Sequence, residues 1–204
     1  MRPILLALVL VLSLARPAAA DFNAGLQLGL NIANANTTPA MATDPRVGLM
    51  VGANLDIELY DFLRLKPEMM YVQKGASTSL TGIDATRRFD YFEVPLLLEV
   101  KLGREAVRPF AFAGPNFGFK VNSAIDTRIG NASPTTFNTD AEPLDVCLDF
   151  GGGVEYWYSK ASAVVFQVRY SYGLTNVVTN PPPGATQVWR STGVQLLAGV
   201  EFAF

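Results

Sequence analysis

Apolar and polar residues alternate one by one along the segment VGLMVGANLDIEL, residues 47–59. Every second residue from Val47 to Leu59 is apolar, whereas the residues between them are small, polar or acidic, except for Met50. A period of two places the two sets on opposite faces of a β-strand. The segment therefore predicts a strand with one apolar face, which must lie against either a protein core or lipid.

The same alternation recurs through the rest of the chain. It is clear at residues 21–32, 89–102, 163–174 and 192–204, and less regular at residues 63–74, 108–122 and 146–157. Together with residues 47–59, these segments give eight expected strands. Most of them have about ten residues or more, which is the length that a tilted strand needs to cross a bilayer.

The expected connections alternate between long and short. The long ones are rich in Asn, Thr, Ser, Pro and Gly and occupy roughly residues 33–46, 76–88, 123–145 and 175–191. The short ones have the sequences YDF, GREAV and YSKA. Long loops at one end and tight turns at the other are typical of outer-membrane barrels. We therefore predict an all-β fold: an eight-stranded antiparallel up-and-down transmembrane β-barrel, with the long loops outside and both termini on the periplasmic side.

The composition of the two faces favours lipid over a protein core. The polar face consists largely of Gly, Asn, Gln and Ser with scattered charges, and the apolar face carries hardly any charge. Aromatic residues gather near both ends of the apolar face, as they do at the two interfaces of a membrane. A soluble secreted lipocalin-like binding barrel, with its apolar face inward and its charges outward, stays the alternative.

The N-terminal segment has the features of a secretory signal peptide. Arg2 precedes an apolar run from Ile4 to Leu14, and three alanines end at Ala20. This order predicts a signal peptide at residues 1–20, followed by the barrel domain at residues 21–204. The formal charge of −2 gives no indication of nucleic-acid binding.

Charged residues of the polar face should point into the barrel. By parity they are Asp56, Glu58, Arg64, Lys66, Glu68, Glu93, Glu99, Lys101, Arg108, Lys120, Asp149, Glu155, Arg169 and Glu201. Eight strands leave an interior just wide enough for side chains, and buried charges need partners. We therefore interpret these residues as a charge-paired network that fills the lumen. A catalytic or ligand-binding constellation is the alternative.

Sequence motifs for catalysis are weak. The chain has no histidine, which excludes a Ser-His-Asp triad and His-based metal sites. The GGG run at residues 151–153 is not followed by the Lys-Ser/Thr of a phosphate loop and more simply indicates close backbone approach. We predict no catalytic residue, no metal and no cofactor. Pro67, Pro95 and Pro115 lie inside expected strands, where a bulge or kink should absorb the missing donors.

Two functions remain open. One is a structural or surface-interaction barrel with a filled lumen and long external loops. The other is a narrow porin-like barrel, or a transport barrel for small hydrophobic ligands. The sequence names no partner for the loops.

A resemblance to a known family supports the barrel. The stretch YFEVPLLLEVKLGREAVRPFAFAGPNFGF, with E-x-P-L-L-L at Glu93–Leu98 and R-P-F…A-G-P at Arg108–Pro115, resembles the small outer-membrane β-barrel family that includes the PorT-like proteins. The resemblance implies a place in the outer membrane of diderm bacteria, with lipid as the surrounding partner. The alternating C-terminal residues look like the signal that the barrel assembly machinery reads: Val200, Phe202 and Phe204.

Overall fold

The computed structural model describes residues 22–40, 42–80, 83–103, 105–130, 132–138, 141–178 and 188–204. The expected signal peptide lies outside these residues. The strands are β1 (Phe22–Thr38), β2 (Asp44–Tyr60), β3 (Leu63–Leu80), β4 (Ile83–Lys101), β5 (Val107–Ile129), β6 (Thr135–Asn138), β7 (Leu144–Trp157), β8 (Ser162–Gly173) and β9 (Val188–Ala203). The described residues contain no helix long and apolar enough to cross a membrane.

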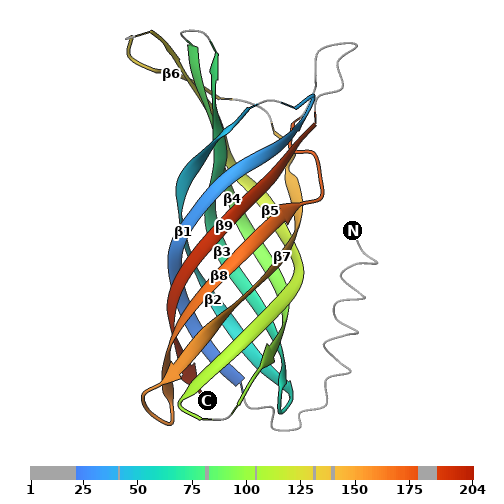
Figure 1. Ribbon diagram of the computed structural model, residues 1–204, viewed down its shortest axis with the longest axis vertical. Helices are drawn as coiled ribbons and strands as arrows, with labels where there is room; N and C mark the ends of the chain where they lie inside the picture. The colour runs from blue at the N-terminus through green and yellow to red at the C-terminus, as the bar shows by residue number, and fades with distance from the viewer. Residues whose placement is uncertain are drawn as a thin grey trace.

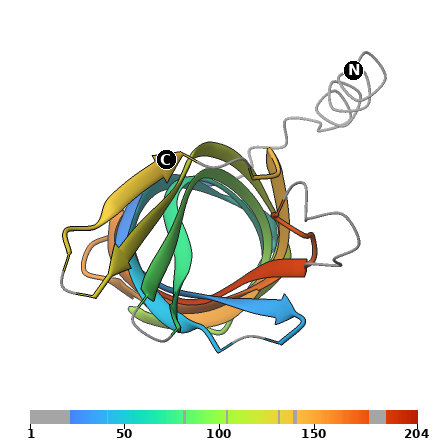
Figure 2. The same cartoon turned by 90° about the horizontal axis from the view of Figure 1, so that it is seen from above.

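Eight of these nine strands form a closed antiparallel ring. Their order is β4-β3-β2-β1-β9-β8-β7-β5, and pairing of β4 with β5 closes the ring, as Figure 2 shows from above. The predicted eight-stranded antiparallel barrel is therefore confirmed. The additional strand β6 pairs only with β5 among the described residues and lies outside the ring.

Both ends of the barrel sequence lie at the end with the short turns (Figure 1). There the amide of Phe204 donates to the carbonyl of Phe22, joining the last residue to the first strand at 3.1 Å. We call this end the turn side and the opposite end the loop side.

Side chains in the wall alternate between the outside and the lumen. In β1, Leu26 and Leu28 are 63% and 67% exposed, whereas Gln27 between them is only 6% exposed. The polar face therefore points into the barrel, and the apolar face covers the outer surface. This is the reverse of a soluble protein, in which burial of apolar surface drives folding.

Three of the four expected long loops are wrong in large part, because the strands continue through them. Within residues 33–46, β1 runs to Thr38 and β2 begins at Asp44. Pairing of β3 with β4 runs up to Leu80 and Ile83, so residues 76–88 form a hairpin. Within residues 123–145, β5 continues to Ile129 and β6 pairs back onto it. Threonine and isoleucine favour strands, and the hairpin supplies their backbone partners. Figure 1 shows this extension rising beyond the rest of the wall.

The expected bulges at the prolines are also absent from the ladders. Pairing keeps the same register on both sides of Pro67, Pro95 and Pro115. The described register shifts lie elsewhere, between Asp90 and Tyr91 and at both ends of β2. The strands therefore keep their register at each proline although its backbone donor is missing.

Candidate functional site

The lumen is the candidate site, because buried charged side chains from most of the strands meet in it. Eight carboxylates and five cations are at most 9% exposed: Asp56, Glu68, Glu93, Glu99, Asp145, Asp149, Glu155, Glu201, Arg64, Lys66, Lys74, Lys101 and Arg169. The interior therefore holds more carboxyl groups than cations. Each charge has been removed from water, so its partners decide whether it stabilises or destabilises the barrel.

Seven of these residues form what we call the turn-side cluster: Asp56, Arg64, Lys66, Glu99, Lys101, Glu155 and Glu201. Its centre is the ammonium of Lys101 in β4, which contacts Asp56 of β2 and lies 2.5 Å from Glu155 Oε1 of β7. Strands β2 and β7 are on opposite sides of the ring. One lysine therefore ties opposite walls together.

A second ammonium in the turn-side cluster belongs to Lys66 of β3. Its Nζ lies 2.9 Å from Glu201 Oε1 and 3.5 Å from Glu99 Oε2. The amide of Asn54 also donates to Glu201 Oε1, at 3.2 Å. Glu201 therefore has both a cation and a neutral donor on one oxygen.

Arg64 connects the turn-side cluster to the rim of the barrel. It lies opposite Glu58 in the β2–β3 hairpin, and its Nη2 is 2.5 Å from Glu58 Oε2. Its Nη1 is 3.5 Å from Asp56 Oδ1. The arginine thus bridges a half-buried rim carboxylate and a fully buried one.

We expect Arg64→Ala to destabilise the barrel in detergent by about 1–3 kcal/mol, because Asp56 and Glu58 lose a partner. Glu58→Ala in the same chain should restore part of the loss, since it removes one of the two carboxylates that Arg64→Ala leaves without the arginine. Urea unfolding followed by tryptophan fluorescence measures both variants. Equal stability of Arg64→Ala and the unchanged protein would contradict this assignment.

The remaining six residues form the loop-side cluster: Glu68, Lys74, Glu93, Asp145, Asp149 and Arg169. Arg169 of β8 reaches across the ring, and its Nη2 lies 2.8 Å from Glu68 Oε2 of β3. Lys74 Nζ lies 2.6 Å from Glu93 Oε1 and 3.1 Å from Asp145 Oδ2. This cluster also joins walls that are distant in the ring.

Two aromatic rings fill space beside the clusters. Phe110 and Phe112 occupy inward positions of β5 and are each 5% exposed. The ring of Phe110 faces Lys66 Nζ at 5.4 Å, and that of Phe112 faces the Arg169 guanidinium at 5.3 Å. Each ring therefore packs against a cation of one cluster, an arrangement that adds cation–π attraction. Gly153 on β7 leaves room for the Phe110 ring.

The loop-side end of the lumen is closed by apolar residues, which we call the mouth cluster: Ala35, Ala76, Phe89, Tyr91, Ala141, Val177 and Trp189. Two connecting segments cross there, because Ala141 and Val178 form an isolated bridge. The amide of Val177 donates to the carbonyl of Trp189 at 3.0 Å. The mouth cluster therefore covers the loop-side cluster.

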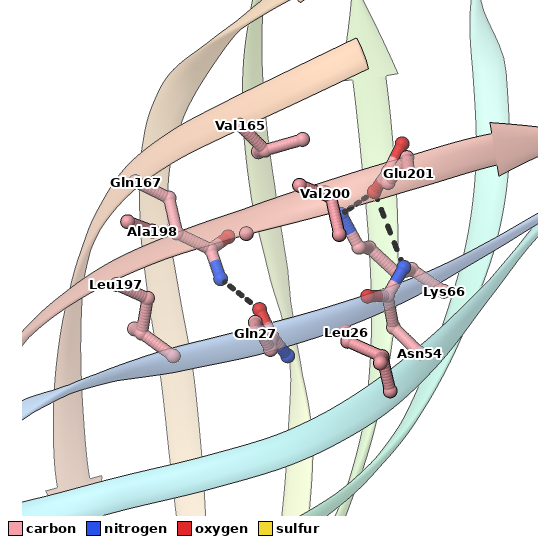
Figure 3. A pocket seen from close by; sticks show the side chains of 11 residues that line it. Leu26, Gln27, Asn54, Lys66, Val165, Gln167, Leu197, Ala198, Val200 and Glu201 are labelled. Carbon is pink, nitrogen blue, oxygen red and sulfur yellow. Dashed lines mark hydrogen bonds and ion pairs between the residues drawn. The ribbon is translucent and has the colours of Figure 1, made fainter. Parts of the chain in front are cut away.

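A polar opening of about 300 Å³ lies at the turn side, next to Arg64 and Lys101, but little space remains between the side chains in the middle of the lumen. A cavity of about 10 Å³ lies beside Gln27, Asn54, Lys66, Gln167 and Glu201 (Figure 3). Figure 3 also shows Gln167 donating to Gln27, a contact of 2.8 Å. Such a volume is about that of one water molecule. In the described part of the barrel, this polar cavity is a water-sized space and not a channel.

One group of carboxylates has the spacing of a metal site. Oxygens of Asp56, Glu155 and Glu201 lie within 4.8 Å of one another. The ammonium of Lys101 already contacts Asp56 and Glu155, and that of Lys66 contacts Glu201. A cation bound by all three carboxylates would compete with these ammonium groups, so the chemistry of this site is that of ion pairs.

Not every residue assigned to the lumen by parity lies in a cluster. Arg108 is at the turn-side rim, with its guanidinium 4.9 Å from the Trp157 ring and its Nε donating to the Glu105 carbonyl. Lys120 is half-buried at the loop side and donates to the Ala141 carbonyl at 2.6 Å.

Sequence reasoning missed other members of the site. Lys74 lies within the expected strand at residues 63–74 and has its inward parity, and extending the strand at residues 146–157 by one residue gives Asp145 the inward parity of β7. The inward rings of Phe110 and Phe112 give no such signal, because the alternation places apolar residues on the lipid face.

Comparison with known proteins identifies the family. A model described as "Outer membrane protein beta-barrel domain" matches residues 14–179. The chain belongs to this family. It is therefore a barrel of the bacterial outer membrane, and lipid lies against its apolar face, which answers the question raised by residues 47–59. The match does not distinguish PorT-like proteins, whose resemblance stays a prediction.

Solved structures of other proteins share the fold. Neisserial surface protein A is 14% identical, with 89% of this chain and 97% of that chain covered and a TM-score of 0.51. OprG from Pseudomonas aeruginosa is 10% identical, with 91% and 96% covered and a TM-score of 0.56. Among curated proteins, none matches the chain.

Proposed function

We propose that this protein is a structural or surface-interaction barrel of the outer membrane. Its lumen is filled by paired side chains, and its loop side faces the cell exterior. The observation that carries the proposal is that salt bridges cross the lumen between opposite walls, as between Arg169 and Glu68. These contacts hold the wall rigid and occupy the space that a solute would need.

Three layers of side chains support a closed lumen. The turn-side cluster, the loop-side cluster and the mouth cluster are all made of buried residues. A conducting barrel needs a continuous polar path of water. Here the mouth cluster is apolar, and the water-sized cavity beside Glu201 leaves little room for solvent.

The same contacts favour a role other than catalysis. A general acid or base must reach its substrate, so it needs access and an uncommitted oxygen or nitrogen. Lys101 is held by three carboxylates and is at most 5% exposed, and Arg169 is fully buried. We propose that the buried charges of the lumen are structural.

We also propose how the chain reaches the membrane. Residues 1–20 would direct export, and the barrel assembly machinery would read the C-terminal strand. Phe202 and Phe204 are exposed on the lipid face, 43% and 72%, with the half-exposed Val200 two positions earlier. The assembly machinery could recognise these alternating apolar residues in the unfolded chain, before the C-terminal strand has paired with its neighbours.

Conductance in planar bilayers tests the closed lumen. We expect the purified barrel to give no stable stepwise current, because side chains occupy the lumen. A large porin inserted into the same membrane is the positive control. Steady cation-selective steps from the unchanged protein would contradict the proposal and would favour the narrow transport barrel, since the surplus of lumen carboxylates would select cations.

A further inference from the structure

A polar pocket lies on the outside of the hairpin extension at the loop side. Its volume is about 500 Å³, and its lining includes Arg46 of β2, Arg88 of β4 and Arg128 of β5. Arg87, the neighbour of Arg88, instead places its guanidinium 5.3 Å from the Trp189 ring of the mouth cluster. Because neighbours in a strand point to opposite faces, Arg88 points away from the lumen. The pocket is therefore separate from the charge clusters.

The three arginines differ in how many of their guanidinium nitrogens already have a partner within the protein. Arg88 Nη2 lies 2.9 Å from Asp126 Oδ1, and Arg46 Nη1 donates to the Lys74 carbonyl at 2.7 Å. The side chain of Arg128 makes no hydrogen bond or ion pair within the described part of the chain. It is opposite Asp84 in the ladder, and Asp84 also lines the pocket. The lining thus holds three guanidinium groups and two carboxylates, with donors left over.

Hydroxyl groups add neutral donors to the same wall. Ser77 and Thr86 are paired across β3 and β4, with their oxygens 2.9 Å apart. The Asp126 carboxylate, which Arg88 contacts, also accepts from Thr136 at 2.7 Å. Asp126 therefore already has two partners, whereas Arg128 and the remaining nitrogens of Arg46 are available to a ligand rich in oxygens.

The height of the pocket relates it to the membrane surface. Phe92 belongs to the lipid face of β4 and is 37% exposed, and Arg88 follows the same face four residues away. Four residues span ~13 Å along a strand, and less in height because the strands are tilted. The pocket thus faces outward just above the apolar belt, where the headgroups of the surrounding lipid lie.

We propose that this pocket binds the phosphate of a lipid headgroup in the leaflet at the loop side. Guanidinium groups bind phosphate oxygens through paired hydrogen bonds, and basic pockets next to a membrane bind anionic headgroups. Guanidinium groups from three strands surround one phosphate from several directions. The assignment to the outer leaflet rests on the orientation given under the proposed function, whereas the binding chemistry does not.

Binding of a phosphorylated lipid by the purified full chain tests the proposal. The barrel in zwitterionic detergent is titrated with a fluorescent acylated glucosamine disaccharide bisphosphate and with its dephosphorylated form. We expect the phosphorylated lipid to bind at least about tenfold more tightly, because only it can use the guanidinium groups. Equal binding of the two lipids would overturn the proposal. Inorganic phosphate that binds as tightly as the lipid would overturn the headgroup assignment.

Variants locate the site. Arg128→Gln should weaken binding of the phosphorylated lipid about threefold to tenfold, and the triple change of Arg46, Arg88 and Arg128 to Gln should abolish the preference for phosphate. Arg190→Gln is the matched control, because Arg190 is exposed on β9 outside the pocket. Unchanged heat-dependent gel mobility shows that the variants fold. Retention of the preference in the folded triple variant would overturn the proposal.

Trypsin treatment of intact cells separates this proposal from the orientation. Cleavage next to Arg128 places the pocket outside the cell and supports the outer leaflet. Phosphate-dependent binding in detergent, together with cleavage next to Arg128 only after the outer membrane has been opened, would overturn the orientation and the choice of leaflet, while the pocket itself would stand.

Discussion

Replacing Lys101 with Met should lower the free energy of unfolding by about 3–5 kcal/mol, because it leaves buried carboxylates without their central cation. The lysine contacts Asp56 and Glu155 on opposite walls, and Glu99 Oε1 lies 3.4 Å from its Nζ. Methionine fills a similar volume, so the loss comes from charge and not from a cavity. Urea titration in lipid micelles, followed by tryptophan fluorescence and by gel mobility, measures the change.

The matched control removes a negative charge from the same cluster. Glu99→Gln should cost little or should stabilise the barrel, since the described lumen holds eight buried carboxylates and only five buried cations. The amide keeps nearly the same shape and can still accept a hydrogen bond. If Glu99→Gln destabilised the barrel as much as Lys101→Met, the surplus of negative charge would not be what sets the balance in the lumen.

Some contacts of the turn-side cluster can be predicted from the sequence, and others cannot. Glu58 and Arg64 flank a short turn, so hairpin pairing alone predicts their contact. Lys101 joins Asp56 of β2 to Glu155 of β7, two strands that are distant both in sequence and in the ring. These contacts depend on the closure and the stagger of the whole barrel, which no local pattern contains.

Alternation also fails to show where a strand leaves the membrane. Residues 76–88 are mostly polar on both faces, so their pattern predicts a loop, yet they are paired through Leu80 and Ile83. Above the lipid there is water on the outer face, and nothing there requires apolar residues. The pattern that identifies the wall within the membrane is therefore lost while the backbone ladder continues.

Alternation also does not predict the apolar residues of the lumen. These residues explain the GGG run at residues 151–153. Phe110 and Phe112 point inward where polar residues were expected. They fit because the neighbouring strand β7 pairs them with glycines: a Cβ on Gly153 would lie 2.6 Å from Phe110 Cζ, and one on Gly151 would lie 3.0 Å from Phe112 Cζ. The close approach that the glycines indicate is made by side chains as well as by backbone.

Gly153→Ala should therefore be among the most damaging small changes in the wall. Its Cβ would also lie 2.2 Å from the carbonyl oxygen of Phe166 in β8, so moving the Phe110 ring cannot relieve the overlap alone. Overpacking of this kind costs typically about 1–3 kcal/mol, and contact with backbone places this site at or above the upper end. Urea unfolding of the refolded variant measures the loss.

Two further variants test the cause. Gly118→Ala is the control for adding a methyl group to an inward glycine, because its Cβ would lie no closer than 3.3 Å to the Asp145 carbonyl oxygen or to Tyr91 Cδ1. Phe110→Leu in the Gly153→Ala chain should recover only the part of the loss that comes from the ring. Complete recovery would mean that the ring sets the whole cost. A neutral Gly153→Ala would mean that β7 and β8 lie farther apart than these contacts require.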